Sequence, residues 1–180
     1  MIEIRLAAAA DIPSVALLVA FSFHPGNGWQ ALWRSFVQLG IEHDLRDRWR
    51  SASPHYRCWL AITTTPQPLC VGSVELDLRP INGHPQPYLS NLAVHPDYRR
   101  QGIGRKLLST VTASLAASPY SSLYLHVLAK NNAARQLYRR CGFVVIGEDT
   151  TVWGERKLLL SQPLTGDRYC PNAAQENLAF

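Results

Sequence analysis

The sequence has no long hydrophobic run, since nowhere does it approach the roughly 20 consecutive apolar residues that a transmembrane helix needs. Its first residues, 2–6, alternate in the manner of a short strand and lack the form of a secretory signal. These two absences lead us to expect a cytoplasmic protein that does not bind membranes.

Cysteine is scarce and irregularly spaced. The four cysteines show no C-x-x-C spacing, so the sequence predicts neither a zinc site nor a disulfide framework. No other grouping of histidine, cysteine and carboxylate residues has the spacing of a ligand set, and we expect no metal.

Charged residues are few, at 17% of the chain, but the net charge is +5. Arginine and lysine cluster at 99–106 and 135–140, which favours an anionic cofactor. The interleaved aromatic and basic pattern of a nucleic-acid-binding protein is missing, so we expect no nucleic-acid partner. The length of 180 residues and the hydrophobic content of 47% predict one folded domain.

The most informative stretch begins with an apolar run, 88–94, that has strand character. A basic, glycine-bearing turn follows at 99–104, and a helical pattern then places Ile103 and Leu107 near one face. Strand, glycine turn and helix together collect backbone N–H groups at a helix N-terminus, where the dipole favours an anion. Glycine permits a close backbone approach that a Cβ would block. The stretch therefore predicts a phosphate-binding loop.

Two common phosphate-binding motifs are absent. The P-loop spacing G-x-x-x-x-G-K-[ST] does not occur. The Rossmann fingerprint fails because Leu107 stands where its third glycine belongs, and no acidic residue follows about 20 residues later. The motif that fits is R-x-x-G-x-G, from Arg99 to Gly104, followed by a predicted strand at 123–128 and by the run 131–143.

These two motifs, in this order, resemble the GCN5-related N-acetyltransferase (GNAT) superfamily. Its acetyl-CoA motif is [QR]-x-x-G-x-[GA], and its next motif is N-x-x-A-x-x-x-Y-x-x-x-G-F; the resemblance is close over residues 70–160. It implies the α/β GNAT fold, a mixed and mostly antiparallel sheet of about seven strands flanked by about four helices. The expected domain covers residues 1–160, with a C-terminal tail at 161–180.

The resemblance also implies how acetyl-CoA is held as co-substrate. Strands 88–94 and 123–128 would splay apart around the pantetheine arm, and the loop would bind the pyrophosphate. The expected binding residues are Leu92, Ala93, Val94, Arg99, Arg100, Gln101, Gly102, Ile103, Gly104, Arg105, Asn131 and Ala134. For Asn131, the cap of the following helix is the alternative role.

Two catalytic residues are predicted. Tyr138 occupies the motif tyrosine and would be the general acid toward the leaving thiolate, with a purely packing role as the alternative. Many members carry a glutamate as general base at the position where this sequence has Tyr88. Because of this departure, Glu75 on the neighbouring predicted strand is the expected base, with His126 or a bound water as alternatives.

Hydrophobic periodicity and turn residues predict the remaining elements. These are strands at 2–6, 56–63, 69–78, 143–147 and 155–160, helices from Asp11 to about Phe23, at 29–49, at 102–117 and at 132–141, and a connector at 81–87. The resemblance places the turn after the first helix beside the acceptor site, so Phe23, His24 and Trp29 are candidates for shaping it.

The implied function is N-acetylation by acetyl-CoA. The sequence looks similar to the cyanobacterial and plastid group, which makes a protein N-terminal α-amine or lysine the expected acceptor. The alternatives are a small-molecule amine as acceptor, or a non-catalytic module that binds acyl-CoA. The protein would be a monomer or homodimer.

Overall fold

The computed structural model describes residues 1–23, 42–43, 45–47, 55–151 and 153–164. Within them the chain forms a seven-stranded sheet of order β1-β2-β3-β4-β5-β7-β6, in which β4 and β5 are parallel and all other neighbours antiparallel. This confirms the expected mixed α/β fold. The predicted helix at 29–49 and the candidates His24 and Trp29 fall largely or wholly outside the described residues.

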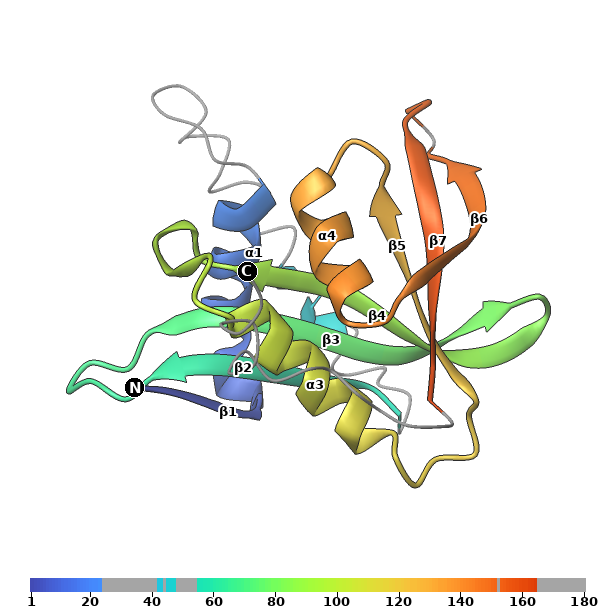
Figure 1. Cartoon of the computed structure of the whole chain (residues 1–180). Helices are drawn as coiled ribbons and strands as arrows, with labels where there is room; N and C mark the ends of the chain where they lie inside the picture. Colours follow the sequence, from blue (N-terminus) through green and yellow to red (C-terminus); the bar gives the residue numbers. More distant parts are fainter. Residues whose placement is uncertain (24–41, 44, 48–54, 152, 165–180) are drawn as a thin grey trace, which may run out of the picture.

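The bounds of the elements follow the chain order (Figure 1). They are β1 Ile2–Leu6, a 3₁₀ turn Ala9–Asp11, α1 Ile12–Phe23, β2 Arg57–Thr63, β3 Cys70–Ile81, β4 His84–Val94, a 3₁₀ turn Pro96–Tyr98, α3 Ile103–Ser114, β5 Ser122–Leu128, α4 Asn132–Arg140, β6 Val144–Thr150 and β7 Arg156–Pro163.

Two hydrophobic cores lie on opposite faces of the sheet. Helices α3 and α4 cover one face, and α1 covers the other (Figure 1). Gly72 of β3 lets α3 approach closely, because a Cβ there would lie 3.0 Å from Ile103 and 3.1 Å from Leu107. This close contact fixes where the N-terminus of α3 meets the sheet.

The connector predicted at 81–87 is wrong. β3 and β4 form one long hairpin that turns at Asn82 and Gly83, which have φ values of 51° and 80°. Asn-Gly is the strongest short signal for a hairpin turn with two positive φ values, but Pro85 and Pro87 argued against a strand. In the described part of the chain, β4 has no second partner strand before Tyr88, and an unpaired edge tolerates proline.

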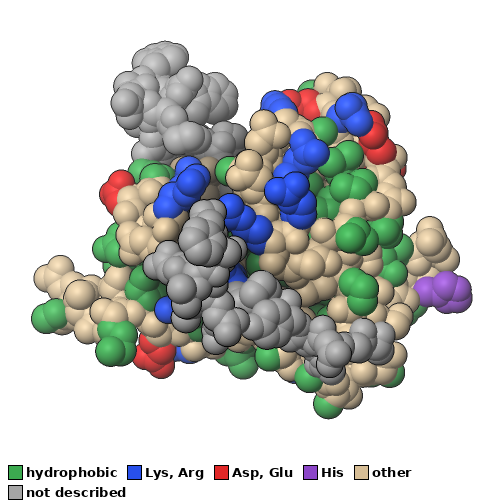
Figure 2. Space-filling view, viewed as in Figure 1, with side chains coloured by type: hydrophobic (Ala, Val, Ile, Leu, Met, Phe, Trp, Pro, Cys, Tyr) green, Lys and Arg blue, Asp and Glu red, His purple; other side chains and the backbone are tan. Residues whose placement is uncertain are grey.

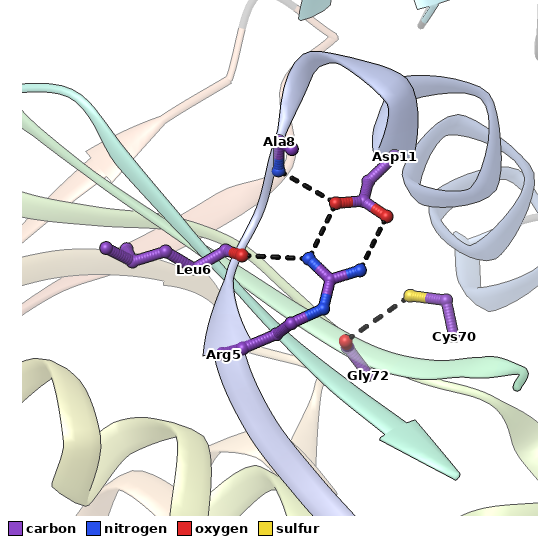
Figure 3. A network of polar contacts seen from close by, with 6 residues as sticks. All are labelled: Arg5, Leu6, Ala8, Asp11, Cys70 and Gly72. Carbon is purple, nitrogen blue, oxygen red and sulfur yellow. Dashed lines mark hydrogen bonds and ion pairs between the residues drawn. The ribbon is translucent and has the colours of Figure 1, made fainter. Parts of the chain in front are cut away.

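A polar clamp joins β1 to the start of α1 (Figure 3). Arg5 donates from Nη1 and Nη2 to the two carboxylate oxygens of Asp11 at 2.7 and 2.8 Å, and Asp11 Oδ2 also accepts from the Ala8 amide. Asp11, at which the sequence predicts the first helix to begin, thus bonds backward to Ala8 in the turn that precedes α1. The bond from Arg5 lowers the pKa of Asp11, and desolvation offsets this in part.

Cys70 lies beside this clamp in Figure 3, and its thiol donates to the Gly72 carbonyl at 3.6 Å. Burial raises the pKa of the Cys70 thiol to about 11, so it stays protonated and unreactive at neutral pH.

β4 and β5 pair at Tyr88 with Tyr124 and at Leu89 with Leu125, and then diverge. A bulge in β4 lies just beyond this point, where Asn91 has a φ of 49° and the register with β3 shifts between Ser73 and Glu75. The expected splay of these two strands is therefore present, and it opens toward the turn before α3.

At the C-terminal side, β7 runs to Pro163 and Leu164 is buried, so residues 161–164 of the predicted tail belong to the folded part. The rest of that tail, 165–180, lies outside the described residues. In the part of the chain that the structure describes, no helix is both long and apolar enough to cross a membrane.

Candidate functional site

The turn between β4 and α3 leaves a helix N-terminus open. Gly102 is the N-cap of α3 and adopts φ 78°, and no side chain caps the helix there. The first bond within the helix runs from the Lys106 amide to the Gly102 carbonyl, so the N–H groups of residues 103–105 have no partner one turn earlier. A Cβ on Gly102 would meet nothing within 4 Å. The turn thus leaves backbone donors at the helix N-terminus without a partner among the described residues.

The second glycine of the motif has a different task. A Cβ on Gly104 would lie 3.1 Å from Cδ2 of Leu137 and 3.8 Å from Cγ2 of Val94. The start of α3 therefore packs between the end of β4 and helix α4. Gly104 sets this close packing, whereas Gly102 supplies the left-handed backbone of the turn.

Basic side chains surround the turn, but they do not all point outward. Arg99 donates from Nε to the Val94 carbonyl at 3.1 Å and from Nη2 to the Ser22 carbonyl at 3.4 Å, which ties the turn to β4 and α1. Arg100 is exposed and Arg105 is half-buried. Figure 2 shows Lys and Arg side chains gathered over α4 and over the turn before α3. The surface beside the open N-terminus is thus positive.

Leu92, Ala93 and Val94 form the last part of β4, where β5 has already diverged. Ala93 is buried toward α1, whereas Leu92 and Val94 pack against the α3 side. Among the described residues, no strand pairs with the edge of this segment that faces β5. The Val94 carbonyl already accepts from Arg99, so the remaining backbone groups of this edge are the ones available for another extended chain. The structure therefore brings this segment and the turn together at one end of the gap between the strands.

Tyr138 is fixed by the way α4 ends. Gly142 adopts φ 85°, its amide donates to the Arg139 carbonyl, and the Phe143 amide donates to the Tyr138 carbonyl. These two bonds form a Schellman motif, and its usual apolar contact is made by the rings of Tyr138 and Phe143, 5.6 Å apart in an edge-on arrangement. The end of the helix predicted at 132–141 is thus confirmed to within one residue.

Tyr138 is buried as a whole residue, at only 7% exposed. Burial raises the pKa of Tyr138 well above its ordinary value, and the nearby Tyr88 and Cys141 raise it further. Tyr138 is therefore protonated at neutral pH and holds a proton that it can share.

Asn131 caps α4, since its side-chain oxygen accepts from the Ala134 amide at 3.1 Å. The alternative role considered for this residue is thus present, and the residue is exposed. Ala134 lies half-buried against the core of the α3 face. Their contact with acetyl-CoA stays a prediction.

Glu75 lies on the opposite face of the sheet from α3. It is 1% exposed, and its carboxylate accepts from Asn91 Nδ2 at 2.8 Å. Since Asn91 is the residue at the bulge of β4, the carboxylate is tied to the place where the gap opens. The catalytic role of Glu75 stays a prediction.

On the same face, a chain of hydrogen bonds joins residues of β4, β5 and β6 and passes over β7. Tyr88 Oη lies 2.7 Å from Nδ1 of His126, and Nε2 of His126 lies 2.9 Å from Oδ2 of Asp149. Tyr88 is at one of the two paired positions of β4 and β5, so the chain begins one residue before the two strands part. Burial raises the pKa of Tyr88, although the charge of Arg79 and a bond from the His126 backbone offset part of the rise.

Sequence reasoning considered His126 as an alternative base and treated Tyr88 as a departure from the family pattern, but it missed Asp149. No local signal marks Asp149, because its proximity to His126 depends on the order β5-β7-β6 and on the strand register. Among the described residues, no group of three or more histidine, cysteine or carboxylate side chains could hold a metal ion.

Comparisons with known proteins agree with this architecture. The sequence profile of the acetyltransferase (GNAT) family matches residues 27–143, more than half of the chain. The ribosomal protein bS18-alanine N-acetyltransferase of Escherichia coli K12 is 47% identical over 55 residues, 31% of this chain and 37% of that protein. N-acetyltransferase family 8 member 3 of Rattus norvegicus is 26% identical over 147 residues, 81% of this chain and 64% of that protein.

The chain thus spans less than two thirds of the length of both relatives. Among solved structures, Arabidopsis thaliana NAA60 in complex with acetyl-CoA superposes with a TM-score of 0.68 at 19% identity, over 92% of this chain and 100% of that chain. At this identity, the likeness concerns the fold.

Proposed function

This chain belongs to the acetyltransferase (GNAT) family, and on that premise we propose that it transfers the acetyl group of acetyl-CoA to a primary amine. The observation that carries the proposal is the uncapped N-terminus of α3, beside the unpaired edge of β4. Coenzyme A carries a pyrophosphate followed by an extended, amide-bearing pantetheine arm, so one molecule can occupy both places at once.

In this proposal the amides that follow Gly102 bind the pyrophosphate, and Arg100 and Arg105 add positive charge. Arg99 contributes by holding the turn through its bonds to Val94 and Ser22. The backbone of 92–94 pairs with the pantetheine amides, and Asn131 and Ala134 border the arm from α4. The acetyl group then lies near Tyr88 and Leu89, where the two strands meet.

The amine nitrogen forms a bond to the thioester carbonyl carbon, the C–S bond breaks, and the thiolate takes a proton. We assign the donation of this proton to Tyr138. In water the pKa of a phenol is near 10 and that of a thiol is near 8.5. Full transfer of the proton from the phenol to the thiolate is therefore uphill by roughly 2 kcal/mol. In this proposal the hydroxyl of Tyr138 first stabilises the thiolate by a hydrogen bond, before the proton moves.

The proton that the amine loses needs an acceptor. Glu75 is the base that the sequence favours, but its carboxylate is buried and bound to Asn91. His126 is the alternative on the same face, and its bond to Tyr88 places it at the opening of the gap. We assign the amine proton to the pair of Tyr88 and His126. In this proposal Glu75 accepts a hydrogen bond from the substrate.

We propose a protein N-terminal α-amine or a lysine as the acceptor, and the α-amine is favoured for two reasons. An α-amine has an ordinary pKa near 8, against about 10.4 for lysine, and so loses its proton more easily. The related Escherichia coli protein also carries a protein alanine in its name. A small-molecule amine is the second candidate.

The test is thiol release from acetyl-CoA in the presence of two synthetic peptides. One has a free N-terminal alanine and no lysine, and the other has an acetylated N-terminus and one lysine. We expect release with the first peptide to exceed release with the second, and mass spectrometry should locate the added acetyl group. Tight acetyl-CoA binding without turnover on either peptide or on a panel of small amines would support the non-catalytic module instead.

A further inference from the structure

Asp149 is a carboxylate of β6 that lies outside the site that the sequence predicts. It accepts from Nε2 of His126 at 2.9 Å, across β7, and Lys157 of β7 lies 3.9 Å from the same oxygen. The side chain of His126 is 21% exposed and that of Asp149 is 54% exposed. The chain of bonds thus runs from the buried Tyr88 to a group in contact with solvent.

The chemistry of the three groups fixes the direction of the bonds. An ionised carboxylate only accepts, so Nε2 of His126 carries a hydrogen and donates it to Asp149. In a neutral imidazole the other nitrogen is then an acceptor, so Nδ1 receives the hydroxyl hydrogen of Tyr88. Without Asp149 the imidazole has no fixed tautomer, and the Nδ1–H form would turn a donor toward Tyr88.

We propose that Asp149 is a positioning residue that holds His126 as the Nε2–H tautomer, so that His126 can draw the hydroxyl proton of Tyr88 during acetyl transfer. This inference rests on the proposed function. As the C–N bond forms, the amine gives its proton to the Tyr88 oxygen, and the Tyr88 hydroxyl proton moves to Nδ1 of His126. The resulting imidazolium lies against the Asp149 carboxylate, which keeps its charge and stabilises it.

Other charged groups face this chain from the neighbouring strands. The Arg79 guanidinium of β3 lies 4.4 Å from the centre of the Tyr88 ring, and Lys157 approaches Asp149. Both are positive, and Asp149 is the negative group that touches the imidazole. Removal of the Asp149 charge should therefore affect the electrostatic environment of His126 more than removal of any other carboxylate on β6.

The experiment compares D149N with E148Q in the full chain. Glu148 is the matched control, because it is the residue of β6 that precedes Asp149 and pairs with Arg156 instead of His126. E148Q also removes the same negative charge as D149N. We expect D149N to lower kcat on the N-terminal alanine peptide by about 10- to 100-fold. The KM for acetyl-CoA and the affinity for acetyl-CoA by calorimetry should change by less than about twofold. E148Q should match the wild type, and D149E should recover part of the loss.

A second measurement needs no turnover. ¹⁵N chemical shifts of the His126 ring report the tautomer directly, and we expect Nε2–H in the wild type and E148Q but a mixed population in D149N. Unchanged kcat, pH–rate profile and tautomer in D149N would overturn the role of Asp149. If the wild type binds acetyl-CoA but acetylates no amine, the proposed function fails, and the tautomer alone decides whether Asp149 positions His126.

Discussion

At the scale of single residues, Tyr138 illustrates how a helix end can fix a side chain. Its carbonyl accepts from the Phe143 amide and its ring packs against the Phe143 ring, so the residue is held at both the backbone and the side chain. The left-handed Gly142 makes this turn possible. The motif tyrosine is thus rigid before any ligand binds.

We expect Y138F to lower kcat on the order of 10- to 100-fold, because it removes the proton donor but keeps the packed ring. The affinity for acetyl-CoA should stay within about twofold. Stopped thiol-release assays and calorimetry measure the two quantities. Y120F, in the loop before β5, is the control and should leave both unchanged; equal kcat values in Y138F and Y120F would remove the acid role.

Gly102 and Gly83 form a matched pair for testing the phosphate site. Both have a positive φ, 78° and 80°, and a Cβ on either would meet nothing within 4 Å. G102D and G83D should therefore have similar strain in the folded state. G102D adds a negative charge at the open helix N-terminus, and we expect it to weaken acetyl-CoA binding at least about 100-fold, which calorimetry can measure.

G83D places the same charge in the turn between β3 and β4, and we expect an unchanged affinity for acetyl-CoA. Equal affinities in the two variants would mean that the turn before α3 does not bind the phosphates. G104V acts by another route, since its side chain would push against Leu137 and shift α3 away from α4.

At the scale of elements, the clamp of Arg5 and Asp11 joins the first strand to the first helix. The pKa of Asp11 is lowered in the folded state, so its carboxylate stabilises the fold above the ordinary carboxyl pKa near 3.9. That stabilisation is lost as the pH falls through the lowered value. Arg5 is 42% exposed, so solvent screening keeps the contribution modest.

We expect D11N to lower the free energy of unfolding by about 1 kcal/mol at pH 7, and the difference from the wild type should vanish as the pH falls well below about 4. Urea unfolding at several pH values measures this. E3Q removes an exposed carboxylate from the same strand and should have little effect at any pH. A D11N penalty that stays constant down to pH 2 would contradict the ion-pair explanation.

Elements were predictable where one local signal dominated. The strand, turn and helix around Gly102 and the helix at 132–141 were predicted because glycine and hydrophobic periodicity act within a few residues. The hairpin at Asn82 was missed because two prolines outweighed a correct turn signal. Whether proline fits a strand depends on the neighbouring strand, and that is not visible in a local pattern.

At the scale of the whole molecule, the two motifs allowed the fold to be predicted, whereas contacts between distant strands could not be. Asp149 of β6 bonds to His126 of β5 across β7, which lies between these two strands in the sheet. The bond from Asn91 to Glu75 likewise depends on a bulge that shifts the register. Local residue patterns carry little information about register, because every long strand offers several similar pairings.

Binding of acetyl-CoA should stabilise the whole molecule, since the ligand contacts only the folded state. At a concentration 100 times the Kd, the free energy of unfolding should rise by about 2.7 kcal/mol, which thermal unfolding measures as a higher Tm. Duplex DNA at the same concentration should leave the Tm unchanged. A larger shift with DNA than with acetyl-CoA would contradict the expectation that the protein has no nucleic-acid partner.

The sheet is continuous between β4 and β5 through two residue pairs alone, at Tyr88 and Leu89. A four-strand ladder and a three-strand ladder therefore meet along a short seam. If the pantetheine arm of the co-substrate fills the space beyond that seam, it completes the hydrogen bonding of the sheet. The arm then takes the place of a strand between β4 and β5. The stiffness of the molecule then depends on the supply of acetyl-CoA. With acetyl-CoA bound the protein has one uninterrupted sheet, and without it the sheet consists of two parts joined only at Tyr88 and Leu89.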